Sequence, residues 1–86
     1  MKIKSGLILR SVGGENVVVP VGEMSKKFHG MITLNETGAF LWKFFAEDHT
    51  QEEAVAALLA EYDVSEEIAQ KAVAIFVEAI SQGFAE

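Results

Sequence analysis

In residues 28–42, FHGMITLNETGAFLW, the apolar residues first alternate with other residues, as in a strand, and then recur at helical spacing. Phe28, Ile32 and Leu34 fall on the same side of the alternation, which is typical of a strand with one buried face. Asn35 follows, and its side-chain oxygen is suited to accept from the first free amides of a helix. We therefore expect a strand over 28–34 and, directly behind it, a helix over 36–47.

The stretch before this segment predicts a β-hairpin. Residues 7–12 and 17–20 are largely apolar or β-branched, and the intervening Gly-Gly-Glu-Asn at 13–16 tolerates positive φ. Pro20 has no amide to donate and ends the second strand. With 28–34 these segments form a three-stranded antiparallel meander, in which the third strand is the candidate edge.

Two further helices follow. Thr-Gln-Glu-Glu at 50–53 is a capping-box signature, and it precedes a helical apolar stripe that predicts a helix over 51–62: Val55, Leu58, Leu59 and Tyr62. Ser65 is the next N-cap, before a helix over 66–82 that Gly83 can end in a left-handed conformation. The expected fold is therefore α+β and winged-helix-like, with a three-stranded antiparallel sheet followed by three helices. We expect one domain over 1–86, because two would each be too small to bury a core.

Composition narrows the classes of partner. The chain has 86 residues, a formal net charge of −6 and no cysteine, so thiolate metal sites and disulfides are excluded. The negative charge disfavours nucleic acid. The first apolar run, 7–9, is too short for a signal peptide or a membrane span, so we expect a cytoplasmic protein that does not bind membranes.

The helix predicted over 66–82 has more apolar surface than one contact needs. Ala69, Val73, Phe76 and Ile80 form an ordinary core stripe. A second stripe lies about 100° away and consists of Ile68, Ala72, Ile75 and Ala79. Either the two preceding helices cover both stripes, or the second stripe is a groove that awaits a partner.

The sequence offers no credible active site. His29 and His49 lie far apart and lack partners at metal-ligand spacing, and the glutamates gather where helices begin, as the helix dipole favours without any catalysis. We expect no metal, no cofactor and no enzymatic activity. A winged-helix DNA-binding protein is the less favoured alternative, since the helix over 66–82 opens with Glu66 and Glu67, which would face phosphates.

Residues 31–42, MITLNETGAFLW, resemble the "LN-x-TG-x-x-(I/L)-W" core of the PqqD family, the pyrroloquinoline quinone synthesis protein D and its relatives. The likeness extends over nearly the whole chain, through the threonine-capped helix and Tyr62-Asp63-Val64. Two positions depart from the family: Ala72 stands where an aspartate is common, and the usual Gly-Leu-(Leu/Ile) ending is Gly83-Phe84-Ala85. These differences bear on which peptide is bound more than on the fold.

The resemblance implies a recognition element for the leader of a ribosomally made precursor peptide. Such a domain presents the leader to a maturation enzyme, either a radical S-adenosylmethionine (SAM) protein or a leader peptidase. In the family the leader adds to the third strand and lies against the third helix. The peptide-binding residues expected here are therefore Phe28, Gly30, Met31, Ile32, Thr33, Ile68, Lys71, Ala72, Ile75 and Ala79.

Three residues of the motif are expected to be structural. Asn35 would cap the helix, Gly38 would allow the helix to approach the sheet closely, and Trp42 would anchor the core. The alternative to a peptide-binding protein is an interaction module whose spare stripe pairs with a second copy to form a homodimer.

We predict that any association with DNA is lost by about 150 mM salt, because scattered lysines neutralise few phosphates. The cations concerned are Lys26, Lys27, Lys43 and Lys71. A gel-shift titration in NaCl measures this. Sequence-specific binding that survives higher salt would contradict the preference for peptide binding and favour the winged-helix DNA-binding alternative.

Overall fold

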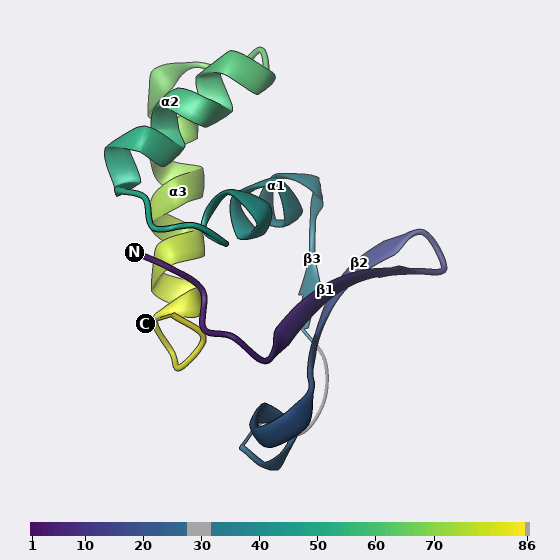
Figure 1. The fold of residues 1–86 in the computed structure, drawn as a ribbon. Helices are drawn as coiled ribbons and strands as arrows, with labels where there is room; N and C mark the ends of the chain where they lie inside the picture. The colour runs from purple at the N-terminus through teal and green to yellow at the C-terminus, as the bar shows by residue number, and fades with distance from the viewer. Residues whose placement is uncertain (28–31, 86) are drawn as a thin grey trace.

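The computed structural model of the chain describes residues 1–27 and 32–85. It has the expected α+β fold, in which a three-stranded antiparallel sheet is followed by three helices (Figure 1). The elements are β1 (Leu7–Val12), β2 (Glu15–Pro20), the 3₁₀ helix η1 (Gly22–Lys26), β3 (Ile32–Leu34), α1 (Glu36–Phe44), α2 (Gln51–Glu61) and α3 (Glu66–Ile80).

The hairpin of β1 and β2 turns on two residues. Gly13 and Gly14 have φ values of 59° and 83°, as a two-residue primed turn requires, and Val12 pairs with Glu15 directly across it. The second strand therefore begins at Glu15 and not at residue 17, since the tight turn leaves Glu15 and Asn16 free to join the ladder.

Two differences from the sequence-based expectation lie between β2 and β3. The short helix η1 was not expected; it begins at Gly22, whose φ is +59°, and it buries Met24 against the core. The strand expected over 28–34 is present over Ile32–Leu34, and residues 28–31 lie outside the described part of the chain.

The core lies among the inner face of the sheet, one side of α3 and the inner sides of α1 and α2. Leu7 and Val18 contribute from the sheet, and the expected core stripe of α3 is confirmed: Ala69, Val73, Phe76 and Ile80 are all buried. Trp42 on α1 is also buried, as expected. The Phe45 ring stacks on the Phe76 ring with their centroids 6.0 Å apart.

The segment before β1 determines where α1 ends. The Ile3 amide donates to the Phe45 carbonyl at 2.8 Å, and Ile3 also forms a bridge with Ala85. The Phe45 carbonyl accepts from a segment outside the helix, and the Phe45 side chain is fully buried. The backbone therefore leaves the helix at this residue. The expectation that this helix continues to 47 was therefore wrong by three residues.

The other two helices also end slightly early. Tyr62 has extended backbone, so α2 ends at Glu61 and not at 62. The last helix ends at Ile80 and not at 82. Gly83 has the expected positive φ, 115°, and the next amide returns to the Ile80 carbonyl at 2.9 Å.

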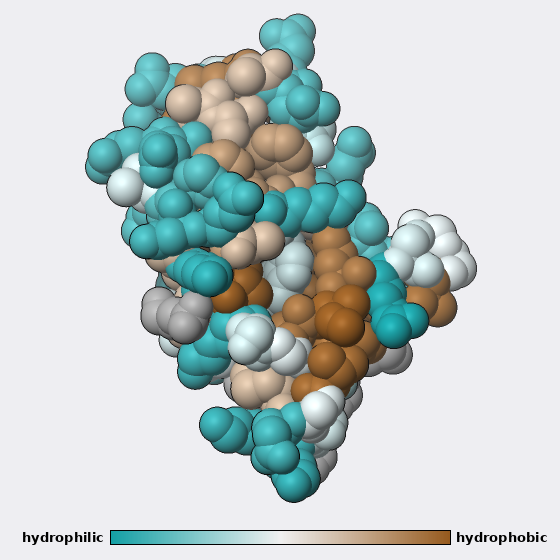
Figure 2. Space-filling view, viewed as in Figure 1, coloured by the Kyte–Doolittle hydropathy of each residue, from teal (hydrophilic) through white to brown (hydrophobic). Residues whose placement is uncertain are grey.

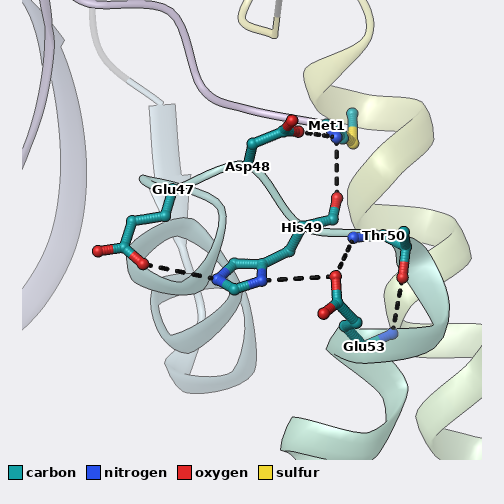
Figure 3. Close-up of polar contacts among 6 residues, drawn as sticks. All are labelled: Met1, Glu47, Asp48, His49, Thr50 and Glu53. Carbon is teal, nitrogen blue, oxygen red and sulfur yellow. Dashed lines mark hydrogen bonds and ion pairs between the residues drawn. The ribbon is translucent and has the colours of Figure 1, made fainter.

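Figure 3 shows the polar contacts that fix the start of α2. The expected capping box is present: the Thr50 hydroxyl accepts from the Glu53 amide at 3.1 Å, and the Thr50 amide donates to the Glu53 carboxylate at 2.8 Å. The Met1 amino group donates to Asp48 at 2.6 Å and to the His49 carbonyl at 2.8 Å. These contacts hold the residues that join α1 to α2 against the start of the chain.

The capping box makes stability depend on pH. The Thr50 amide is the main cause that holds the pKa of Glu53 below its ordinary value of 4.5. A carboxyl whose pKa is lower in the folded state stabilises that state above its unfolded pKa, and this contribution is lost as pH falls through the folded pKa.

We therefore predict that Glu53→Gln lowers the thermal midpoint at pH 7, and that its difference from wild type shrinks below pH 4.5. Thermal unfolding followed by circular dichroism between pH 7 and pH 2 measures it. Glu52→Gln is the matched control, since it removes the same charge from the same helical turn. A Glu53→Gln effect that stays constant over this range would contradict the explanation.

Candidate functional site: a groove between strand β3 and helix α3

Strand β3 lies at an edge of the sheet. The strand order is β1-β2-β3, and β3 is antiparallel to β2, with Thr33 opposite Val17. Ile32 and Leu34 are half-buried and pack against the core, whereas Thr33 is exposed on the other face. The edge expected from the sequence is thus present over the described residues of this strand.

The second apolar stripe of α3 is not covered by the other helices. Ile75 is 70% exposed and Ile68 is 57% exposed, Ala79 is exposed, and Ala72 is half-buried. Of the two explanations left open by the sequence, the one in which helices cover both stripes was wrong. The reason is geometric: α1 and α2 pack against the core stripe, which lies on a different side of α3.

The strand edge and part of this stripe face each other across a groove of about 370 Å³. One wall comes from the end of β3 and the start of α1, the other from α3, and the buried side chains of Leu41 and Phe76 form the floor. This volume is near the lower end of the range for small-ligand pockets. The groove suits a few side chains of an extended peptide better than a large cofactor.

The Asn-x-Thr-Gly motif builds the first wall. The Asn35 side chain accepts from the Gly38 amide at 2.7 Å, which confirms its role as the N-cap of α1. A Cβ at Gly38 would lie 3.4 Å from the Leu34 Cβ and 3.1 Å from the Asn35 oxygen, so glycine allows α1 to start close against β3. The expected close approach is confirmed, and Thr37 completes the wall.

The structure brings together some of the expected peptide-binding residues. Thr33, Ala72, Ile75 and Ala79 line the groove. Ile32, Ile68 and Lys71 do not line it. Lys71 lies instead 3.4 Å from the Glu67 carboxylate on the exposed side of α3. The remaining three, Phe28, Gly30 and Met31, lie outside the described residues.

Six lining residues were not expected from the sequence as part of the site: Leu34, Asn35, Thr37, Gly38, Leu41 and Phe76. Asn35 and Gly38 were assigned purely structural roles, and Phe76 was assigned to the core stripe of the last helix. The signal that could have identified the wall is the Leu-Asn-x-Thr-Gly motif itself, because it joins a strand edge directly to a helix start.

The groove lining is suited to binding. It contains no acidic, basic or thiol residue, and its polar residues are Thr33, Asn35 and Thr37. In the part of the chain that the structure describes, no three His, Asp or Glu side chains converge as a metal site would require. None of the described helices is long and apolar enough to cross a bilayer.

Comparisons with known proteins agree with this architecture. The family model for coenzyme PQQ synthesis protein D (PqqD) matches residues 15–83. A solved structure of TbiB1 in complex with the TbiA(beta) leader peptide is similar over 100% of both chains, with a TM-score of 0.72 and 23% identity. A lasso peptide synthetase B1 complexed with the leader peptide has a TM-score of 0.72 and 17% identity, over 98% of this chain and 93% of that one. A search of curated proteins gives no match.

At these identities the structural likeness establishes the fold.

Truncation of the neighbouring residues Ile75 and Phe76 should change the stability of the protein by very different amounts. We predict that Ile75→Ser changes the free energy of unfolding by at most about 0.5 kcal/mol, as at other exposed positions. Phe76→Ala should cost about 3–5 kcal/mol, because it empties a core position. Urea unfolding measures both. A large loss for Ile75→Ser would mean that the exposed stripe is structural.

Proposed function

Because this chain belongs to the PqqD family, we propose that it binds the leader of a ribosomally made precursor peptide and presents it to a maturation enzyme. The observation that carries the proposal is the open groove between a strand edge and an uncovered apolar stripe. The proposed role is non-catalytic, since affinity and positioning are what such a groove supplies.

The binding mode that fits this geometry is strand addition. A leader segment pairs with the backbone of β3 around Ile32 and Thr33, and with Met31, and the sheet gains a fourth strand. Main-chain hydrogen bonds then give affinity, and alternate side chains of the peptide point into the groove and give specificity. The small side chains of Ala72 and Ala79 leave room there for a leucine or phenylalanine of the leader.

The structural relatives support this occupant. Both similar structures are described as holding a leader peptide, and their fold matches at least 98% of this chain. The enzyme that receives the leader belongs, in the proposal, to the radical SAM class or to the leader peptidases, as the family resemblance implies.

Lys71 has a smaller role than the groove residues. It lies outside the lining and already has Glu67 as an exposed partner. A contact with an acidic leader residue would contribute at most about 1 kcal/mol, because exposed ion pairs are screened by solvent. Specificity in this proposal therefore depends on the shape and apolar character of the groove.

We predict that Ala72→Trp weakens leader binding by about 1–3 kcal/mol and changes stability little, because the indole fills the groove and not the core. Isothermal titration calorimetry with a leader peptide that the wild type binds measures the affinity, and urea unfolding measures the stability. Ala74→Trp is the matched control, since Ala74 is exposed on the same helix and does not line the groove. Equal affinities for wild type and Ala72→Trp would contradict the binding site.

Amide chemical shifts during the same titration locate the peptide. The proposal expects changes over 28–34 and 68–79. Changes confined to 50–62 would place the peptide elsewhere. If no peptide binds and the chain instead forms dimers that Ala72→Trp disrupts, the stripe is a self-association surface.

A further inference from the structure

A second groove lies between α2 and α3. It has a volume of about 480 Å³, and its apolar wall is formed by Val55, Ala56 and Leu59 of α2. Leu59 is 38% exposed although it belongs to the apolar stripe that the sequence predicts for this helix. Glu52 and Glu66, each in the first turn of its helix, lie at the rim.

This groove and the leader groove lie on different sides of α3. The α3 positions that line the second groove are 66, 70 and 73, whereas the leader groove uses 72, 75, 76 and 79. With 3.6 residues per turn, the two sets are about 140° apart around the helix axis. They share no lining residue, so both grooves can be occupied at the same time.

Charge is segregated toward the second groove. The segment 47–67, which includes α2 and the start of α3, carries eight of the 13 acidic residues and none of the seven lysines and arginines. The rest of the chain has five acidic residues against those seven basic ones. Figure 2 shows hydrophilic side chains beside paler apolar ones over α2, and the most hydrophobic surface lies below them, toward the sheet.

The negative charge around the α2–α3 groove indicates which kind of partner can bind there. A second copy of this chain that paired through the same groove would bring one acidic segment against another, which is costly when like charges meet across an interface. Nucleic acid and anionic lipid are repelled for the same reason. A cationic protein segment with an apolar face is attracted, and a trough between two helices accepts such a segment as an amphipathic helix.

We propose that the α2–α3 groove docks a basic amphipathic helix of the maturation enzyme while the leader occupies the other groove. This inference rests on the proposed function. Apolar side chains of the enzyme helix lie on Leu59 and Ala56, and its lysines or arginines face Glu52 and Glu66. Helix α3 then separates enzyme and substrate by its own width, and so brings both to one small domain.

The test uses the full chain, the leader of a candidate precursor peptide and the maturation enzyme that acts on that precursor. Ala56→Arg places a bulky positive charge in the groove at an exposed helical position, where arginine is a good helix former. We expect at least a tenfold loss of affinity for the enzyme and less than a twofold change for the leader peptide, both measured by biolayer interferometry. Glu66→Lys should act in the same direction, and affinity of the wild type should fall as NaCl rises from 50 to 500 mM.

Glu78→Lys is the matched control, since it reverses an exposed charge on α3 that lines neither groove, and it should leave enzyme affinity within threefold of wild type. If Ala56→Arg binds the maturation enzyme as tightly as the wild type does, the docking surface is wrong. It is also wrong if the wild type binds the leader but not the enzyme. Loss of a homodimer in Ala56→Arg would assign the groove to a second copy instead. Failure of the wild type to bind the leader at all would overturn the proposed function itself.

Discussion

Burial of one stripe of α3 is the constraint on which the rest of the structure depends. Val73 is 1% exposed, and the residues that share its cluster come from the sheet, from all three helices and from the segment before β1. Each large side chain buried there stabilises the fold by about 1.5–3 kcal/mol. Because this stripe takes up only one side of the helix, two other sides remain available, and a groove lies along each of them.

The parts of the fold that the sequence predicted well are those determined by near neighbours. The caps at Asn35, Thr50 and Ser65 each accept from an amide three residues ahead, so all the atoms involved lie within one turn. The core stripe of α3 was predictable because helical periodicity alone separates it from the polar positions. The strand order followed from short connections, since consecutive strands pair with each other.

The parts that the sequence did not predict depend on distant segments. Helix α1 ends at Phe44 because the amide of Ile3 bonds to the carbonyl of the next residue, a contact between segments about forty residues apart that no local pattern contains. The groove lining was only partly predictable for a related reason. Leu41 and Phe76 are buried core residues, and only the position of β3 and α1 relative to α3 makes them the floor of a groove.

Because the core and the leader groove share residues, peptide binding is coupled to local unfolding of the core. Leu41 belongs both to the core cluster and to the floor of the leader groove, so an opening of the core also removes the surface on which a peptide lies. A peptide that binds only the closed state suppresses such openings, by about 2.7 kcal/mol at a concentration one hundredfold above its Kd. Backbone amides of α3 would then exchange their hydrogens more slowly in the complex, including those on the side of the helix that the leader never touches.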